Sequence, residues 1–359
     1  MFKQTYNIIG VMSGTSLDGV DLAHIVFTKN DSTWSFEILE CETLPYEPFW
    51  LNNLKQAIYF SDYELEKLNL DYTNHLGTII KQFINKNNIT NIDAVSSHGH
   101  TILHQPSKGL TLQIGNLAAI ATITEQKVVC DFRVQDVALG GQGAPLVPIG
   151  DQFLFSEYDY CLNLGGFSNI SFDDNGTRKA FDISPVNTVL NHYANFLGLE
   201  YDNKGLIANS GKVNLELLNQ LNEIAYYQQN HPKSLGIEFV KQDVLPLIEK
   251  NYLEIEDKLA TFTEHIALQI ANALPNKSGK MLITGGGAYN NFLIHRMQFY
   301  LPEIIFAIPS PKVLEFKEAL IFGLLGVLKL RNENNVLASV TGCPVDHCSG
   351  FIYQSKDQT

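Results

Sequence analysis

One short turn near the start of the chain, within GVMSGTSLDGVD (residues 10–21), combines three glycines with hydroxyl side chains and two aspartates. Glycines allow a ligand to approach the backbone closely, and consecutive N–H groups form a nest for anionic oxygens. A carboxylate beside phosphate is repulsive unless a cation or its waters lie between them, so Asp18 and Asp21 are candidate ligands of Mg²⁺, directly or through water. The alternative is a hairpin turn whose polar side chains satisfy local backbone groups. The candidate phosphate-binding residues are Gly14, Thr15, Ser16, Leu17, Asp18, Gly19, Val20 and Asp21.

Two further glycine-rich turns occur later in the chain. NLGGFSNIS (residues 163–171) offers Gly165, Gly166 and Asn169 without a charge. In LITGGGAYNN (residues 282–291) a strand runs into three glycines, which is a usual place for a nucleotide, and a tight strand–helix turn is the alternative. Its candidate residues are Gly285, Gly286, Gly287 and Asn290. No Walker motif and no protein-kinase signature accompanies them.

Asp182 and Arg133 are the candidate catalytic residues. Asp182, in AFDISPVN, stands at the expected end of a strand just before a helix, where the helix dipole favours its ionised form. An ionised carboxylate there can accept a proton from water or a hydroxyl, whereas a capping aspartate is the alternative. Arg133, in CDFRVQD, can neutralise charge that builds on a transferred phosphoryl group, or form a structural pair with an aspartate.

Histidine and cysteine clusters are weaker candidates for metal binding. His98 and His100, in SSHGHTILHQP, lack an evident third ligand, so contact with substrate or a structural role is expected, and Gln142 is a further candidate for substrate binding. Cys343 and Cys348 have His347 between them, but four ligands at workable spacing are missing, and a metal is not expected there.

The elements that would position these residues follow a repeated order. Three strands with turns between them open the chain (YNIIGVM, VDLAHIVF and WSFEILE), a helix follows at 62–88, and IDAVSSHGH is another strand. The pattern returns with YDYCLNLGG, FSNISFD and RKAFDI, followed by a helix at about 185–197, capped by Ser184 with Pro185 in its first turn. We therefore expect an α/β chain of two similar halves, domains at 1–129 and 130–335, a ligand cleft between them, and residues from about 336 to 359 packing back on the first.

Composition restricts the classes of function. A chain of 359 residues with 45% hydrophobic residues has enough apolar material for two cores. The net charge of −13 repels phosphate backbones, so nucleic acid is not an expected partner. Five irregularly spaced cysteines predict neither a disulfide framework nor a zinc site. The N-terminus lacks a signal peptide, and the apolar run at 319–330 is too short to span a bilayer, so a cytoplasmic setting without membrane contact is expected.

The motifs together resemble the anhydro-N-acetylmuramic acid kinases. GVMSGTSLDGVD resembles that family's signature, and the likeness continues through HGHTILHQP, TLQIG, DFRVQD, GGQGAPLVP, NLGGFSNIS, FDISPVN, PKSLGIE, ITGGGAYN and KEALIFGLL. The family belongs to the superfamily of sugar kinases, Hsp70 and actin. The resemblance therefore implies two ribonuclease-H-like domains with an active-site cleft between them that holds ATP.

The resemblance also implies a specific reaction, part of peptidoglycan recycling. Water opens the bridge of 1,6-anhydro-N-acetylmuramic acid while oxygen 6 takes the γ-phosphoryl group of ATP, giving N-acetylmuramic acid 6-phosphate and ADP. Asp182 matches the family's general base and would activate the water, because the bridging oxygen carries no proton. Arg133 would orient water or stabilise charge, and Glu318, in KEAL, would face the sugar. ATP and Mg²⁺ are the implied cofactors, and a homodimer is the implied assembly.

Several positions depart from the family's pattern. His100 stands where the family commonly has glutamine, Asn116 stands where it has aspartate, and Ile183, Ser184 and Val186 replace residues of its FDTGPGN motif. Because such segments are expected near the sugar, two alternatives remain. One is a kinase of another anhydrosugar such as levoglucosan, and the other is a nucleotide and sugar sensor that transfers nothing.

Overall fold

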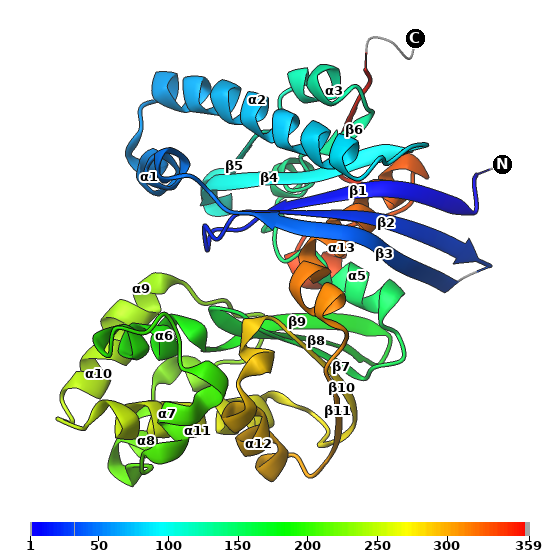
Figure 1. Cartoon of the computed structure of the whole chain (residues 1–359). Coiled ribbons are helices and arrows are strands. Elements are labelled where there is room, and N and C mark those ends of the chain that lie inside the picture. The colour runs from blue at the N-terminus through cyan, green and yellow to red at the C-terminus, as the bar shows by residue number, and fades with distance from the viewer. Residues whose placement is uncertain (1, 32, 356–359) are drawn as a thin grey trace. The chain divides into compact units, whose positions relative to one another are not determined.

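The computed structural model describes residues 2–31 and 33–355, which form two compact units (Figure 1). Unit 1 comprises Met1–Leu154 and Phe316–Thr359, and unit 2 comprises Phe155–Glu315. The chain thus leaves unit 1 once and returns to it inside helix α13 (Pro311–Leu330). At Phe316 the backbone of α13 departs from helical geometry, with φ −106° and ψ 18°.

Unit 1 is built on a sheet in the order β12-β6-β4-β1-β2-β3. Strands β1 (Thr5–Ser13), β2 (Val20–Asn30) and β3 (Thr33–Leu44) form an antiparallel meander. Beside β1 lie two parallel strands, first β4 (Ala94–Gln105) and then β6 (Val128–Cys130). Two shorter strands pair antiparallel with these, namely β5 (Leu110–Ile114) on β4 and β12 (Phe351–Tyr353) on β6.

Helices cover both faces of this sheet (Figure 1). One face carries α2 (Asp62–Lys86), which begins with a capping box between Ser61 and Glu64, together with α3 (Ala119–Thr124). The other face carries α5 (Val147–Leu154) and the part of α13 that belongs to unit 1. The central strands β1, β2 and β4 are therefore buried along most of their length, as expected for a sheet covered on two sides, even where β4 carries polar residues. Shorter helices of unit 1 are α1 (Pro48–Gln56), α4 (Val134–Ala138) and α14 (Ala338–Thr341).

Unit 2 repeats the same strand order, β11-β10-β7-β8-β9. Its meander is β7 (Tyr160–Leu164), β8 (Phe167–Asp174) and β9 (Thr177–Pro185), and its two parallel strands are β10 (Ser278–Thr284) and β11 (Glu303–Ala307). The core packs this sheet against a set of helices around the long α11 (Ile255–Ala273). The other helices are α6 (Asn187–Phe196), α7 (Leu206–Ser210), α8 (Leu215–Asn222), α9 (Ile237–Phe239), α10 (Leu245–Glu249) and α12 (Asn291–Tyr300).

Three antiparallel strands followed by two parallel ones make a ribonuclease-H-like sheet, and the chain contains it twice. The expected α/β fold with two similar halves is confirmed. The unit bounds differ from the expected domains 1–129 and 130–335. The segment after β6 belongs with unit 1 because its side chains bond there, with Asp131 to Asn116 and Asp136 to Thr341.

The expected helix start at Ser184 and Pro185 is wrong. Both residues belong to β9, where Ser184 is opposite Ser168 of β8 and its amide donates to the Ser168 hydroxyl. Pairing with β8 thus outweighs the local preference of Ser-Pro for a helix start, and α6 begins at Asn187.

No helix among residues 2–31 and 33–355 has both the length and the hydropathy that crossing a bilayer requires.

Candidate functional site

The glycine turn of unit 1 joins β1 to β2 and projects beyond the sheet. The amide of Leu17 donates to the Gly14 carbonyl at 3.2 Å, and Leu17 itself has a positive φ of 64°. Gly19 is required by space, because a Cβ there would lie 2.4 Å from the Leu44 carbonyl oxygen. Thr15, Ser16 and Asp18 are exposed, whereas Asp21 is half-buried and its Oδ1 accepts a hydrogen bond from Thr43 Oγ1 at 2.6 Å.

A buried hydrogen-bond network holds Ser13, the residue just before this turn. Ser13, the last residue of β1, has its hydroxyl 2.6 Å from the Tyr46 hydroxyl and 2.7 Å from Nδ1 of His100. Tyr46 in turn is hydrogen-bonded to Tyr72 of α2. Burial lowers the pKa of His100 to about 4, so the imidazole is neutral and acts within the network. Through this bond to Ser13, His100 helps to hold the glycine turn in place.

Arg133 is held in place by His98 and by a backbone carbonyl. Nδ1 of His98 lies 3.0 Å from the Gly99 carbonyl oxygen and must carry the proton, which leaves Nε2 to accept from Nε of Arg133 at 2.9 Å. Nη1 of Arg133 donates to the Gly143 carbonyl at 2.7 Å. Burial and the neighbouring Arg133 keep the pKa of His98 well below its usual range. With both nitrogens occupied, His98 orients the guanidinium and has no lone pair left for a metal.

Glu318, Arg133 and Asp21 are electrostatically coupled within unit 1. Glu318 is exposed at the residue level, but the protein groups close to its carboxylate raise its pKa, Asp21 adds to this, and Arg133 opposes it. Burial lowers the pKa of Arg133 to about 10, and Glu318 acts in the opposite direction, so the guanidinium stays charged at neutral pH. The fourth candidate for substrate contact, Gln142, has an exposed side chain, and its amide donates to the Thr341 carbonyl at 2.8 Å.

Asp131 gives unit 1 a specific dependence of stability on pH. Burial raises the pKa of Asp131 to about 6, although Nδ2 of Asn116 donates to it at 2.9 Å. A carboxyl whose pKa is raised in the folded state binds more protons there than in the unfolded chain. Its contribution to the free energy of unfolding therefore falls as the pH rises from about 4 to 6.

We expect Asp131→Asn to stabilise the protein at pH 7.5 by on the order of 2 kcal/mol, because the neutral amide avoids burying a charge. Asparagine also tolerates the positive φ of 58° at this position. Its new amide group can donate to Oδ1 of Asn116, which is buried without a hydrogen-bond partner. The gain in melting temperature over wild type should shrink towards pH 4. The control is Asp71→Asn, an exposed carboxylate on α2, which should show no such trend. An equal gain at both pH values would contradict the assignment.

In unit 2 the two remaining glycine turns meet at one edge of the sheet. β7 and β10 run parallel, with Asn163 opposite Thr284, so both strands end at this edge. Gly285, which has a φ of 80°, packs so closely that a Cβ would lie 2.7 Å from Oδ1 of Asn163 and 2.8 Å from the carbonyl carbon of Leu164. The carbonyl oxygen of Gly166 accepts from the amides of Val186 and Thr188 at the start of α6.

Asp182 lies on β9 next to this edge, in register with Asn169 of β8. Its Oδ2 accepts a hydrogen bond from the Leu235 amide at 2.9 Å, and its backbone carbonyl accepts from the Tyr226 hydroxyl at 2.6 Å. Burial raises the pKa of Asp182, and the Leu235 amide partly offsets this. One carboxylate oxygen is thus fixed by the protein, and the raised pKa makes the carboxylate a stronger base than an exposed aspartate.

A cavity of about 460 Å³ opens beside the third glycine group. Most of the residues that line it have polar side chains, although much of the exposed wall is carbon: Asn187, Leu190, Asn191, Tyr201, Asp202, Asn203, Lys204, Gly286, Gly287, Tyr289, Asn290 and Asn291. The volume lies within the range of small-molecule sites. Asn290 also caps α12, since its Oδ1 accepts from the Leu293 amide at 3.0 Å.

The structure therefore brings the candidate residues together in two groups. Unit 1 couples Asp21, Arg133 and Glu318, with His98 and His100 as their supports. Unit 2 gathers Asp182, Asn169 and both of its glycine turns at one sheet edge. Sequence reasoning missed Leu235, which binds Asp182, and most of the cavity lining. The polar residues Asn187, Asn191, Asp202 and Asn203 were the available signal for that lining.

Comparison with known proteins gives a consistent result over nearly the whole chain. The family model described as anhydro-N-acetylmuramic acid kinase matches residues 6–355. A relative of that name from Hydrogenovibrio crunogenus is 33% identical over 359 residues, which cover 96% of this chain and 97% of the relative. Another from Mannheimia succiniciproducens is 33% identical and covers 98% of this chain and 100% of its own. A third, from Francisella tularensis subsp. novicida, is 32% identical over 93% of this chain and 95% of its own.

Proposed function

The chain belongs to the anhydro-N-acetylmuramic acid kinase family, and we propose that it phosphorylates 1,6-anhydro-N-acetylmuramic acid with ATP while water opens the anhydro bridge. The observation that carries the proposal is the half-buried Asp182, with one oxygen fixed by the Leu235 amide and its pKa raised by burial. The bridge oxygen has no proton to give up, so a base in this reaction must act on water. The raised pKa of Asp182 suits that task.

The nucleotide is assigned to the glycine turns. Gly165, Gly166, Gly285 and Gly287 present backbone at the ends of parallel strands, where phosphates and nucleosides commonly bind. The cavity next to Gly286 has amide groups that can hydrogen-bond a base or ribose. The turn at residues 14–21 supplies backbone amides and hydroxyls for the phosphate tail.

Mg²⁺ is assigned to Asp18 and Asp21. Their donor set suits this ion, which binds in proteins through one or two carboxylates, water and substrate phosphate oxygens. Asp18 is exposed, and the Thr43 hydroxyl fixes Oδ1 of Asp21. When bound, the ion neutralises phosphate charge.

In the reaction, Asp182 takes a proton from water, and the water oxygen bonds to the anomeric carbon. The bond between that carbon and oxygen 6 breaks, oxygen 6 bonds to the γ-phosphorus, and ADP leaves. Arg133 stays charged throughout, because its lowered pKa of about 10 is still above neutrality. Its positive charge stabilises negative charge that develops during the transfer. Glu318, coupled to Arg133, is assigned to the sugar.

Mass spectrometry of the products formed from ATP and 1,6-anhydro-N-acetylmuramic acid in isotope-labelled water tests this function. We expect one ADP per sugar phosphate, with the label at the anomeric position when the reaction is quenched early. Levoglucosan should be a poor substrate, because it lacks the N-acetyl and lactyl groups. ADP release without a labelled sugar phosphate would rule the function out.

Asp21→Asn should raise the Mg²⁺ concentration needed for half-maximal turnover, because one of the two proposed carboxylate ligands is lost. An unchanged Mg²⁺ dependence would remove Asp21 from the metal site.

The resemblance also implies a homodimer and a cytoplasmic location, and both stay predictions. Size-exclusion chromatography with light scattering measures the first directly.

A further inference from the structure

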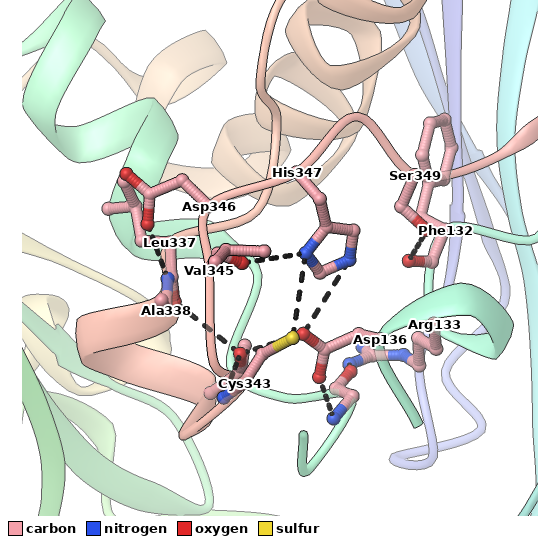
Figure 2. Close-up of polar contacts among 12 residues, drawn as sticks. Phe132, Arg133, Asp136, Leu337, Ala338, Cys343, Val345, Asp346, His347 and Ser349 are labelled. Carbon is pink, nitrogen blue, oxygen red and sulfur yellow. Dashed lines mark hydrogen bonds and ion pairs between the residues drawn. The ribbon is translucent and has the colours of Figure 1, made fainter. Parts of the chain in front are cut away.

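A buried cluster in unit 1 lies outside the residues that the proposed phosphorylation assigns to catalysis or binding. Asp136 of α4, Cys343 and His347 converge from segments far apart in the sequence, and one ligand atom from each lies within 4.8 Å of the others (Figure 2). All three side chains are buried, with exposed fractions of 0%, 5% and 7%. Carboxylate, thiolate and imidazole are the three side-chain ligand types that zinc prefers.

The protonation of His347 points to a missing cation. Nδ1 lies 3.1 Å from the Val345 carbonyl oxygen, which can only accept, so Nδ1 carries the proton. In the neutral ring, Nε2 then has a bare lone pair, and it faces Oδ1 of Asp136 at 3.7 Å. Nε2 is buried without a hydrogen-bond partner. Two electron-rich atoms facing each other in the protein interior are unfavourable unless a positive charge lies between them.

The surrounding contacts resemble those of established metal centres. Histidine ligands usually donate their other N–H to a backbone carbonyl or carboxylate, as His347 does to Val345. Ligating carboxylates are hydrogen-bonded as well. Oδ1 of Asp136 accepts from Thr341 Oγ1 at 2.8 Å, and Oδ2 accepts from the Gly143 amide at 2.6 Å. In a tetrahedral zinc site, neighbouring ligand atoms are about 3.3–3.8 Å apart. The separation of 3.7 Å between Nε2 and Oδ1 falls in that range, and the three ligand atoms lie within 4.8 Å of one another, so small side-chain movements would bring all three to an ion.

We propose that Asp136 Oδ1, Cys343 Sγ and His347 Nε2 form a structural site for a thiophilic divalent cation, Zn²⁺ above all, with a fourth position for water. On binding, the Cys343 thiol loses its proton to solvent and the sulfur bonds to the ion, so about one proton is released per ion. His347 keeps its Nδ1 proton. Softer sulfur and nitrogen ligands select zinc over Mg²⁺ or Ca²⁺.

Such an ion would stiffen the segment that holds Arg133. The Gly143 amide donates to Asp136, and the Gly143 carbonyl accepts from Arg133. The ion would therefore attach the C-terminal loop at 343–347 to α4, whose N-cap residue is Arg133. Asp136 is thus a positioning residue, because it reaches Arg133 through the Gly143 backbone and through its charge. Cys343 and His347 would act on Arg133 only through the ion and Asp136.

A relay in which Cys343 is a nucleophile activated by His347 and Asp136 fits the geometry less well. The distance of 3.7 Å between Nε2 and Oδ1 is too long for the hydrogen bond that such a relay needs. The sulfur is also buried, so a substrate has no access to it. A protonated His347 would instead form a buried ion pair with Asp136, with Nε2 and Oδ1 3.7 Å apart, and the metal content of the protein distinguishes that state from an occupied ion site.

The test uses the full chain purified without chelator, with metal content measured by inductively coupled plasma mass spectrometry. We expect about one zinc per chain in wild type and in Cys348→Ser, and less than about one tenth in Cys343→Ser. Cys348 is the matched control, because it is a free thiol five residues along that is outside the cluster. Zinc at a hundredfold excess over its dissociation constant should raise the melting temperature of metal-stripped wild type by about 3–4 °C.

A second measurement does not depend on any variant folding. Cobalt added to the metal-stripped wild type should give a sulfur-to-cobalt charge-transfer band and the intense visible bands of a tetrahedral site. The weak visible bands of octahedral cobalt, without a sulfur-to-cobalt charge-transfer band, would overturn the proposal. So would a metal-free wild type whose melting temperature zinc leaves unchanged, or full zinc retention by Cys343→Ser.

Discussion

Asp182→Asn is expected to lower kcat for sugar phosphorylation by about 10²–10⁴-fold while the affinity for ATP changes little. The amide cannot take a proton from water, so the attacking water loses its base. Its carbonyl oxygen can still accept the hydrogen bond from the Leu235 amide, and the fold around β9 should therefore survive. Turnover is measured by coupled ADP release and nucleotide binding by calorimetry.

Asp174→Asn is the matched control for this variant. Asp174 is an exposed aspartate at the end of β8 in the same sheet, so its substitution should leave kcat unchanged. In wild type, kcat/KM should fall as the pH drops through the raised pKa of Asp182, because protonation removes the base. Near-wild-type turnover by Asp182→Asn would remove Asp182 from the mechanism. A wild-type chain that binds ATP and sugar without releasing ADP would instead be the sensor.

Local patterns were sufficient to predict the repeated meander. Apolar runs separated by glycine turns specify hairpins within a few residues, and both halves carry three such runs followed later by parallel strands. The places of Gly19, Gly165 and Gly285 could be predicted for the same reason, since each follows a strand directly or precedes one. The expected position of Asp182 is wrong in detail: pairing with β8 extends β9 to Pro185, so Asp182 lies inside the strand, away from the start of α6, and burial raises its pKa where a helix dipole would lower it.

Contacts between distant segments could not be predicted in this way. Ser184 is a strand residue because Ser168 binds it across the sheet, and no local signal at 184–186 reports that pairing. The spacing of Cys343 and His347 argues against a metal site only if all ligands must come from neighbouring positions in the sequence. Asp136, which stands far earlier in the sequence, completes the cluster because the C-terminal segment returns to unit 1.

Arg133→Met should lower kcat by about 10²–10³-fold, comparable to the loss of one preorganised electrostatic stabiliser. The variant removes the positive charge and both directed contacts, Nε to His98 and Nη1 to the Gly143 carbonyl. Arg133→Lys keeps the charge but cannot make both contacts, because an ammonium lacks the planar fork of guanidinium. We therefore expect lysine to restore only a small part of the lost rate.

The pH profile separates an electrostatic role for Arg133 from a purely structural one. Arg133 holds down the pKa of Glu318, so Arg133→Met should raise that pKa further and add a second, Glu318-dependent fall of kcat/KM at acid pH beside the one due to Asp182. Arg133→Lys should leave the acid side of the profile near that of wild type, because a cation remains. Arg331→Lys is the control, since Arg331 contacts the Lys3 carbonyl before the start of β1. If lysine restores full activity, the bidentate geometry is dispensable. If methionine adds no second fall of kcat/KM at acid pH, Arg133 does not act on Glu318, and the electrostatic role of the guanidinium in catalysis is wrong.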